Sequence, residues 1–330
     1  MAATVIGQGS AETASLAASG QAPGAGATVA VLLCTFNGAP FIEQQLDSIR
    51  RQQGLPVRLY VSDDGSGDET LSILESYCRR WGAGSIQVLP GPGRGHVANF
   101  FSLVCSRQVE GQYFAYSDQD DIWDSDKLAR ATAALASLPG DQPALYCSRT
   151  RLVSASGRPL GHSPLFRRPP GFANALVHNI GGGNTMVLNR RARDLLRAAG
   201  EVDVVSQDWW TYLLVAGAGG TVIYDPKPSL SYRQHGRNVV GSSMGARERV
   251  LRGWRVLRNR NRDWNSRNIA ALRQSQALLS PEGCRVLDEF ERARHAGLLA
   301  RLVGMRRAGI YAQSFIGNLG LIAATLFKKI

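Results

Sequence analysis

Short apolar segments alternate with amphipathic ones over the first part of the chain, from Thr28 to about Ser137. The apolar segments are bounded by Gly, Pro, Asn and Asp, which is typical of buried strands. They are Ala30–Cys34, Val57–Val61, Ile86–Leu89 and Tyr113–Tyr116. Because strands that alternate with helices form parallel sheets wrapped by crossover helices, we predict an α/β fold with a mostly parallel sheet flanked by helices.

The segments between these strands repeat apolar residues every three or four positions, as amphipathic helices do. Four helices are predicted, with Ile42, Leu46 and Ile49 on the buried face of the first, Leu71, Leu74, Tyr77 and Trp81 on that of the second, His96–Val109 as the third and Asp124–Asp126 as the start of the fourth. The order of elements is therefore strand, helix, strand, helix, repeated.

The pattern changes further along the chain. Between Ala144 and Arg233 strands and helices are mixed, with Thr185–Leu188 predicted as a strand and Asp208–Val215 as a helix. After Gly241 the sequence predicts helices rich in Arg up to its end. We therefore expect a mixed region after the parallel sheet, followed by a helical segment.

Charge and composition divide the chain into three parts: 1–27, 28–240 and 241–330. The first part is mostly Ala, Gly and Ser, without the basic start and apolar run of a signal peptide, and is expected to be a disordered tail. The net charge is +12, from 38 Lys/Arg and 26 Asp/Glu, and 17 of these basic residues but only 6 acidic ones follow residue 240. A near-neutral body thus precedes a basic segment, which usually meets phosphate groups.

Acidic clusters come directly after two of the predicted strands. Asp63 and Asp64 follow the second strand, and Asp118, Asp120 and Asp121 follow the fourth. Because the carboxyl ends of parallel strands line one crevice, both clusters should face the same ligand. Ordinary turn and capping chemistry explains a single such Asp, whereas two clusters favour a divalent cation with a polar ligand.

The sequence blocks around these residues resemble family 2 glycosyltransferases of the GT-A fold. They are VAVLLCTFNG, VSDDGSGDET, FAYSDQDDIWDSDKL, GGGNTMVLN, QDWWTYLL and SYRQHGRNVVG, in this order, over about residues 28–241. They are most similar to the rhamnosyltransferase-like group that builds bacterial surface polysaccharides. The resemblance implies a GT-A domain over 28–240, a nucleotide-diphosphate sugar donor and a saccharide or lipid-linked saccharide acceptor.

The resemblance also implies which residues hold the donor and a metal ion. Asp64 would hold the nucleobase with Asp63 beside it, and further donor contacts would come from Thr35, Asn37, Arg94, Gly183, Asn184 and Arg233. Asp120 would be the direct ligand of Mg²⁺ or Mn²⁺, Asp118 would bind ribose or metal, and Asp121 remains a competitor for the metal. His235 would reach back to the metal or diphosphate. Carboxylate-bound cations neutralise the charge that develops on a diphosphate leaving group.

Asp208 matches the acidic base of the family. A carboxylate at this position would accept the proton of the acceptor hydroxyl as its oxygen attacks the anomeric carbon. The resemblance then implies single displacement with inversion. Gln207 stands where many relatives have an acidic residue or His, and is expected only to orient its neighbours.

The basic C-terminal part predicts contact with an anionic membrane surface. Arg249–Trp264 mixes Trp and Leu with Arg, as helices that lie in a lipid interface do. Ala308–Phe327 has a stripe of Tyr311, Phe315, Leu319, Ile322 and Leu326, but its polar and Gly residues favour an interfacial or re-entrant position over spanning. We expect a location on the cytoplasmic side of the bacterial inner membrane, in keeping with five widely spaced cysteines that suit a reducing compartment.

Two alternatives remain at this point. The Arg-rich segment would also suit a nucleic-acid-binding protein, although the acidic crevice would repel a polyanion and no nucleic acid is expected as partner. A sugar nucleotidyltransferase also uses paired carboxylates and a metal, but no Gly-rich loop followed by Lys occurs near the first strand. The sequence leaves the donor sugar, base, acceptor, linkage and oligomeric state open.

Overall fold

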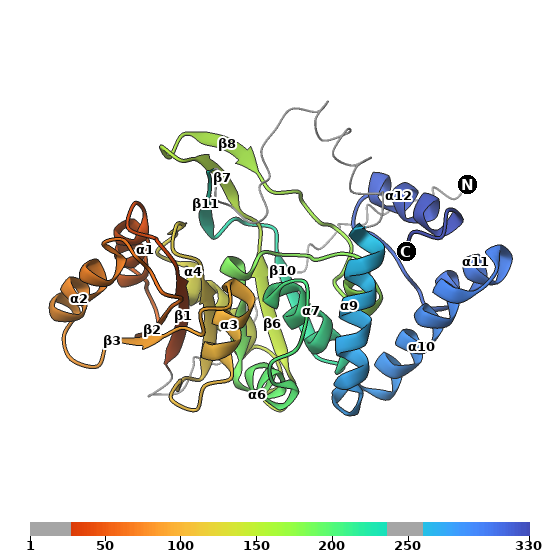
Figure 1. The fold of residues 1–330 in the computed structure, drawn as a ribbon, viewed down its shortest axis with the longest axis horizontal. Helices are drawn as coiled ribbons and strands as arrows, with labels where there is room; N and C mark the ends of the chain where they lie inside the picture. Colours follow the sequence, from red (N-terminus) through yellow and green to blue (C-terminus); the bar gives the residue numbers. More distant parts are fainter. Residues whose placement is uncertain (1–27, 236–259) are drawn as a thin grey trace, which may run out of the picture.

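The computed structural model describes residues 28–235 and 260–330. The strands are β1 Val29–Thr35, β2 Val57–Asp63, β3 Ile86–Pro90, β4 Tyr113–Ser117, β5 Ile122–Trp123, β6 Ala144–Ser148, β7 Arg151–Ser154, β8 Pro159–His162, β9 Val187–Asn189, β10 Thr221–Asp225 and β11 Leu230–Gln234. They form two sheets, and helices cover both faces of the larger one (Figure 1).

The helices connect these strands and continue after them. They are α1 Ile42–Arg50, α2 Thr70–Trp81, α3 His96–Val104, α4 Lys127–Ala136, α5 Phe172–Ala175, α6 Arg190–Ala199, α7 Gln207–Gly217, α9 Arg260–Gln274, α10 Pro281–His295, α11 Leu298–Arg307 and α12 Phe315–Leu326, with short 3₁₀ turns η1 Gly183–Thr185 and η2 Gln276–Leu278. α1 and α2 lie at one end of the molecule, and α10 to α12 lie at the other (Figure 1).

The larger sheet has seven strands in the order β10-β6-β9-β4-β1-β2-β3. β1 pairs in parallel with β2 and β4, β2 pairs in parallel with β3, and β6 does so with β10. β9 alone runs antiparallel to both of its neighbours in this sheet, β4 and β6. The predicted mostly parallel sheet is therefore confirmed, in the arrangement of a GT-A fold.

The core has two parts, one on each face of the large sheet. Alternate residues of β1 enter different parts: Ala30 and Leu32 pack with α3, α6 and α7, whereas Val31 and Leu33 pack with α1, α2 and α4. This alternation follows from the two-residue period of a strand. All seven residues of β1 are buried, as expected of a strand covered on both sides.

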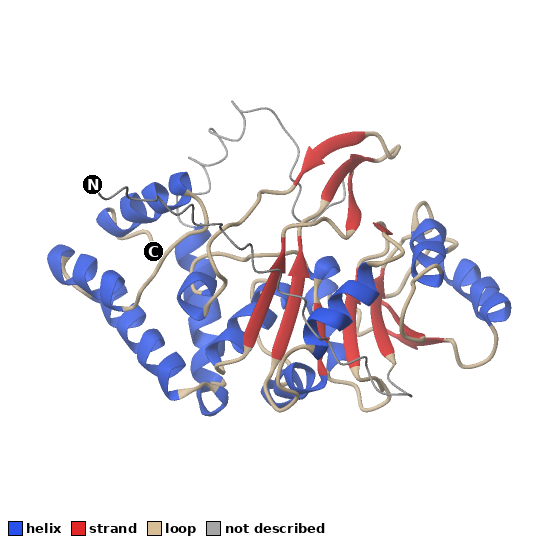
Figure 2. Cartoon of the chain, turned by 180° about the vertical axis from the view of Figure 1, so that it is seen from behind, coloured by secondary structure: helices blue, strands red, loops and turns tan. Residues whose placement is uncertain are grey.

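A smaller sheet lies beyond one end of the large one, with the order β5-β11-β7-β8 (Figure 2). β11 runs antiparallel to β5 and parallel to β7, and β8 closes the edge as an exposed strand. The sequence predicted mixed elements here but not a separate sheet. β5 directly follows the Asp118–Asp121 cluster, so this sheet helps to place that cluster.

Several predicted element bounds were wrong. The third helix ends at Val104 instead of Val109, because the Arg193 side chain donates to the carbonyl oxygens of Val104 at 3.0 Å and Val109 at 3.2 Å and so replaces the helical bonds. The strand expected at Thr185–Leu188 starts later, at Val187, after the η1 turn. Leu71 is 42% exposed, because the second helix faces the core through Leu74 and Tyr77.

The helical C-terminal part differs from its prediction in two places. Of the expected interfacial helix 249–264, only the residues from 260 onward are described, and Trp264 packs edge-on against Trp209 with ring centroids 6.1 Å apart. Tyr311 does not belong to the last helix, which starts at Phe315 with the Ser314 side chain accepting a bond from Gly317. In the described ranges, no helix is long and apolar enough to cross a bilayer.

Candidate functional site

The loop after β2 is shaped from within by Asp63. Its carboxylate accepts hydrogen bonds from the Thr35 hydroxyl at 3.1 Å, the Gly65 amide at 3.1 Å, the Ser66 amide at 2.8 Å and the Ser66 hydroxyl at 2.6 Å. Both carboxylate oxygens therefore face the loop, and the side chain is only 7% exposed. Asp63 and Thr35 join the ends of two adjacent strands.

Asp64 points the other way, toward the Gly-rich loop after β3. One of its oxygens accepts from the Gly93 amide and the other from the Gly95 amide, each at 2.7 Å. These glycines have φ of 66° and 86°, a region that favours glycine over other residues. Asp64 is half-buried, and its carboxylate retains lone pairs for a further donor.

Gln119 is a site residue that the sequence reasoning missed. Its side-chain oxygen accepts from the Phe36 amide at 2.9 Å and its nitrogen donates to the Phe36 carbonyl at 3.1 Å. A Cβ at Gly38 would lie 2.3 Å from the Gln119 oxygen, so the glycine makes room for this contact. Asn37 accepts from the Gly67 amide at 2.8 Å, and the loops after β1, β2 and β4 are thereby joined.

The Gly-rich loop carries two charged or titratable side chains. Arg94 is exposed and forms an ion pair with Glu201 at 2.8 Å, which directs its guanidinium toward the segment after α6. His96 starts α3, and the sequence reasoning did not single out its side chain. Burial lowers the pKa of His96, while the negative charge of Asp208 acts in the opposite direction, so the two side chains interact electrostatically.

The carboxylates after β4 are crowded together. Asp120 is 9% exposed and lies 2.6 Å from His235 Nε2, with the His235 ring stacked on Phe41 at a centroid distance of 5.0 Å. Burial, together with the charges of Asp120 and Asp208, raises the pKa of Asp118 to about 8. Asp118, Asp120 and Asp208, which are distant in sequence, therefore share one electrostatic environment.

Asp121 turns inward, away from that group. It is fully buried, and one oxygen accepts from the Asn184 side chain at 2.5 Å while the other accepts from the Arg233 amide at 3.4 Å. Burial raises the pKa of Asp121 well above its usual value, with further contributions from Asp120 and Asp118. Asp121 thus fixes η1 and β11 against the acidic motif.

Arg233 is also part of this internal framework. Its guanidinium donates to the Asp120 carbonyl at 3.0 Å, the Ala155 carbonyl at 2.6 Å and the Gln44 side chain at 2.7 Å, and it lies 4.8 Å from the Phe41 ring centroid. The side chain is 3% exposed. These contacts hold the backbone that bears Asp120.

Asp208 lies in the first turn of α7 and reaches across to η1. One oxygen accepts from the Gly183 amide at 3.0 Å, and the other accepts from the Trp209 amide at 2.6 Å and from the Ser206 hydroxyl. The neighbouring Gln207 is 6% exposed, and no residue in the described parts of the chain bonds to its buried side-chain oxygen. The predicted base is therefore held against the residue that precedes Asn184.

The side chains of this site are of the types that bind Mg²⁺ or Mn²⁺. Asp118, Asp120 and His235 offer oxygen and nitrogen ligands, and the raised pKa of Asp118 reflects negative charge that a cation would compensate. Across the described ranges, no three His, Cys, Asp or Glu side chains are arranged to hold a metal ion. Mg²⁺ in nucleotide sites is commonly held by one or two carboxylates and substrate phosphates, so a complete protein cage is not required.

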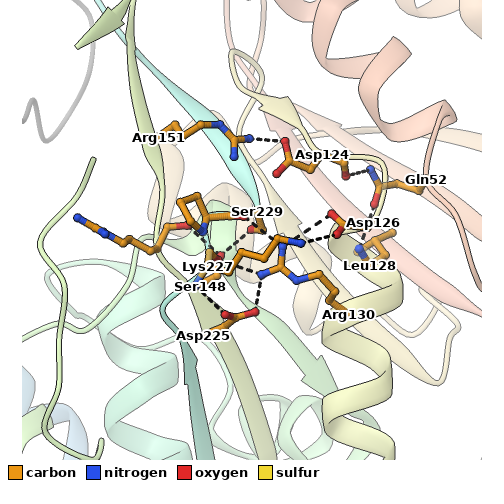
Figure 3. A network of polar contacts seen from close by, with 12 residues as sticks. Gln52, Asp124, Asp126, Leu128, Arg130, Ser148, Arg151, Asp225, Lys227 and Ser229 are labelled. Atoms are coloured by element: carbon orange, nitrogen blue, oxygen red, sulfur yellow. Dashed lines mark hydrogen bonds and ion pairs between the residues drawn. The ribbon is translucent and has the colours of Figure 1, made fainter. Parts of the chain in front are cut away.

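A polar network behind the acidic motif fastens it to the rest of the fold (Figure 3). Asp124 pairs with Arg151 of β7, and Arg130 of α4 pairs with Asp225 at the end of β10. Burial acts to raise the pKa of Asp225, but hydrogen bonds from Tyr146 and Arg130 hold that pKa below its usual value. The segment that follows the motif is thus tied to both sheets.

Lys127 lies within the same segment and is buried. Its side chain has no exposed area, and the ammonium nitrogen lies 4.0 Å from the Trp123 ring centroid. Burial lowers the pKa of Lys127 to about 7, with the charge of Asp121 acting in the opposite direction. No hydrogen-bond partner for this nitrogen occurs among the described residues.

Known proteins are similar to this chain in sequence. The dTDP-rhamnosyl transferase RfbG of Shigella flexneri is 28% identical over 232 residues, which cover 67% of this chain and 77% of that protein. The uncharacterized protein Rv1520 of Mycobacterium tuberculosis is 24% identical over 220 residues, and the chain spans 61% of its length.

Solved structures show a similar fold at low sequence identity. The mannosyltransferase PcManGT from Pyrobaculum calidifontis, in complex with GDP-Man and Mn²⁺, matches 91% of this chain and 85% of its own with a TM-score of 0.50 and 19% identity. S. aureus TarS 1–349 with UDP-GlcNAc matches 86% and 93% with a TM-score of 0.52 and 17% identity. Residues 30–184 match the family model described as glycosyl transferase family 2. This match and the Shigella relative make the chain similar to rhamnosyltransferase-like glycosyltransferases of family 2.

Proposed function

We propose that the chain moves a sugar from a nucleotide-diphosphate donor to a saccharide or lipid-linked saccharide acceptor, with inversion and with Mg²⁺ or Mn²⁺. The observation that supports this most directly is the contact of Asp208 with the Gly183 amide at 3.0 Å, next to Asn184, which bonds to Asp121. Through these contacts the acidic motif after β4 and the carboxylate of α7 meet at one turn. We assign the chemistry to the domain 28–240.

The donor would lie along the loops after β1, β2 and β4. Asp64 would accept a hydrogen bond from the nucleobase, since its half-buried carboxylate retains lone pairs for a further donor. Thr35, Asn37 and Asp63 would act through the shape of the loops, because their hydrogen bonds are made within and between those loops. Arg94 would approach the diphosphate only after release from Glu201.

The diphosphate would lie next to Asp118, Asp120 and His235, which would hold the cation. When bound, the cation neutralises the negative charge that develops on the leaving diphosphate. Arg233 would keep the Asp120 backbone in place instead of contacting the diphosphate itself, because its guanidinium is already bound inside the fold. Gly183 and Asn184 would border the transferred sugar.

Asp208 would act as general base. Its carboxylate would take the proton of the acceptor hydroxyl while that oxygen attacks the anomeric carbon from the face opposite to the diphosphate. Attack on that face inverts the configuration. The amides of Gly183 and Trp209 hold the carboxylate in one orientation before the acceptor binds.

The name of the Shigella relative supports a deoxythymidine-diphosphate rhamnose donor. We further propose a role in bacterial cell-surface polysaccharide synthesis, at the cytoplasmic face of the inner membrane. An acceptor that is linked to lipid would be presented at that surface.

A donor screen tests this function. Purified full-length protein is incubated with Mn²⁺ or Mg²⁺, a lipid-linked saccharide extract and dTDP-rhamnose, UDP-GlcNAc or GDP-mannose, and nucleotide-diphosphate release is measured. Release with one donor, abolished by EDTA and restored by metal, is the expected result. No release with any donor and metal, together with salt-sensitive binding to DNA in a gel shift, would instead favour a nucleic-acid-binding protein.

A further inference from the structure

Exposed apolar side chains are concentrated at the C-terminal end of the fold. Of the 14 large hydrophobic residues that are exposed in the described structure, nine lie between Leu298 and Phe327. They belong to α11 and α12 or follow directly after α12, at the end of the molecule opposite to α2 (Figure 1). Soluble proteins rarely leave such a concentration of apolar surface without a partner.

α12 places these residues on one face. Phe315, Leu319, Ile322 and Leu326 recur every three or four positions and are 78%, 51%, 51% and 44% exposed, and Ile316 beside them is 80% exposed. Residues with this spacing share one side of a helix. The outward face of α12 is therefore apolar along its whole length.

The opposite face of α12 is fixed to the protein. Ala324 and Thr325 are buried, and the Thr325 carbonyl accepts a hydrogen bond at 2.8 Å from Arg301 of α11. On α11, Leu299 is 79% exposed and Val303 is 50% exposed, whereas Arg301 between them is 5% exposed. α11 thus turns Arg301 inward and Leu299 and Val303 outward.

The charge along this last segment of the chain has only one sign. From Arg292 to Ile330 the sequence contains seven Lys or Arg residues and no Asp or Glu. Arg306, Arg307 and Lys328 are exposed at the ends of α11 and α12. Apolar side chains bordered by basic ones complement an anionic lipid surface, where acyl chains and phosphate groups lie at adjacent depths.

The segment that leads into α12 is also joined to α7, the helix that contains the proposed base. The Tyr311 carbonyl accepts from Asn174 at 2.9 Å, and Gln313 donates to the same Asn174 side chain at 3.2 Å. The Tyr212 hydroxyl of α7 donates to that side chain as well, at 3.0 Å. The segment that precedes α12 is therefore linked through Asn174 to α7, whose first turn contains Asp208.

We propose that the outward faces of α11 and α12, named here the docking surface, bind an anionic phospholipid bilayer with α12 lying in its interface. A helix of 12 residues is about 18 Å long, too short for the roughly 30 Å of a hydrocarbon core, so it lies along the surface. This inference rests on the proposed function, because it gives the site at which a lipid-linked acceptor is reached.

Vesicle flotation tests the docking surface without donor or metal. Full-length protein is mixed with vesicles of phosphatidylcholine alone or of equal parts phosphatidylcholine and phosphatidylglycerol. We expect flotation with the anionic vesicles only, and a loss of about ten-fold or more in affinity for Ile316→Ser/Leu319→Ser. Leu71→Ser on α2 is the matched control, because Leu71 is also exposed. This variant should float like the unchanged protein.

A second pair of variants separates charge from apolar contact. Arg307→Glu/Lys328→Glu should abolish the preference for anionic vesicles, whereas Arg50→Glu/Arg79→Glu, on exposed positions of α1 and α2, should leave most of it. Unchanged circular dichroism spectra and unfolding temperatures confirm that each variant folds.

The proposal is overturned if the Ile316/Leu319 variant floats as well as the unchanged protein, or if the unchanged protein binds neither vesicle. It is also overturned if the same substitutions instead dissociate a dimer in light scattering, which would identify a second copy as the occupant. Vesicle binding without nucleotide release from any donor would count against the proposed function alone. Nucleotide release without vesicle binding would count against the docking surface alone.

Discussion

The carboxyl edge of the large sheet and the α11–α12 pair distribute polarity in opposite ways. At the sheet edge, Asp120, Asp121 and Arg233 are less than 10% exposed and their charges are held by neighbouring polar groups. In α11 and α12 the charged ends are exposed, as are Leu299 and Ile316, at 79% and 80%. At the sheet edge the charged groups are buried and held by polar neighbours, whereas in the helix pair both the charged ends and the apolar side chains face solvent.

Asp208→Asn should show the largest effect. The amide keeps the size of the side chain but cannot take a proton, so sugar transfer should fall about 10²- to 10⁴-fold. Donor and metal binding, measured by calorimetry, should stay within about two-fold, because the hydrogen bonds of Asp208 are with η1, Ser206 and its own helix turn.

Asp263→Asn is the matched control for that variant. Asp263 is exposed in the first turn of α9, and its replacement should leave transfer unchanged. Equal activities for the two variants would contradict the role given to Asp208 and with it the contrast between the two regions.

Lys127→Met should stabilise the fold in a pH-dependent way. The pKa of Lys127 is lowered to about 7 by burial, so below its unfolded pKa of about 10.4 the unfolded chain binds more protons than the folded one. The penalty from Lys127 is therefore absent above that pH, grows as pH falls and is complete below about pH 7. Urea unfolding at pH 7 and pH 10 should show a larger gain for the variant at pH 7.

Asp225→Asn should destabilise the protein by about 1–3 kcal/mol, because it removes the charge of a carboxylate that Arg130 and Tyr146 bind in a half-buried place. The pKa of Asp225 is lowered in the fold, so this loss should be present above about pH 4 and should vanish as the pH falls through the lower, folded pKa.

The exposed pair of Asp203 with Arg267 provides the comparison for Asp225. The side chains are 79% and 46% exposed, and Asp203→Asn should cost less than about 1 kcal/mol in the same urea titration. Similar losses of stability for both substitutions would contradict the idea that the more buried ion pair of Asp225 contributes more than the exposed ion pair of Asp203.

Gly38→Ala should have the smallest effect, a rise of about ten-fold or less in the donor KM. The new methyl group would displace the Gln119 side chain from Phe36 and loosen the loop that faces the donor. Gln119→Ala should produce a similar rise, and the double variant should be no worse than Gln119→Ala alone. An additive loss would show that Gly38 acts through another neighbour.

The sequence predicted the elements whose cause is local. β1 and β4 are continuous apolar runs because both of their faces are covered, and the predicted bounds of β1 to β4 lie within two residues of those observed. Their acidic ends also lie at one edge, as the rule for parallel strands requires. The end of the third helix could not be predicted in this way, because Arg193, which captures its carbonyls, lies some ninety residues later.

The sequence predicted which carboxylates gather at the candidate site, but it did not predict which side chains bond inside the fold. Motif order predicted roles for Asp120 and Asp208 that stay predictions, and it gave Arg233 a contact with the diphosphate, whereas the structure binds its guanidinium inside the fold. Gln119 was passed over because its partner is the backbone of Phe36, which leaves no pattern in the side chains.

The single reversed strand of the large sheet has a consequence for how such a site can change. Because β9 runs against β4 and β6, the segment that enters it reaches the edge where its parallel neighbours end. The residues that lead into β9 and the residues that follow β4 and β6 therefore lie at the same edge of the sheet, although they belong to separate stretches of the chain. Under the proposed function, substitutions in the segment that leads into β9 would change which acceptor hydroxyl is used without changing the loops proposed to hold the nucleotide.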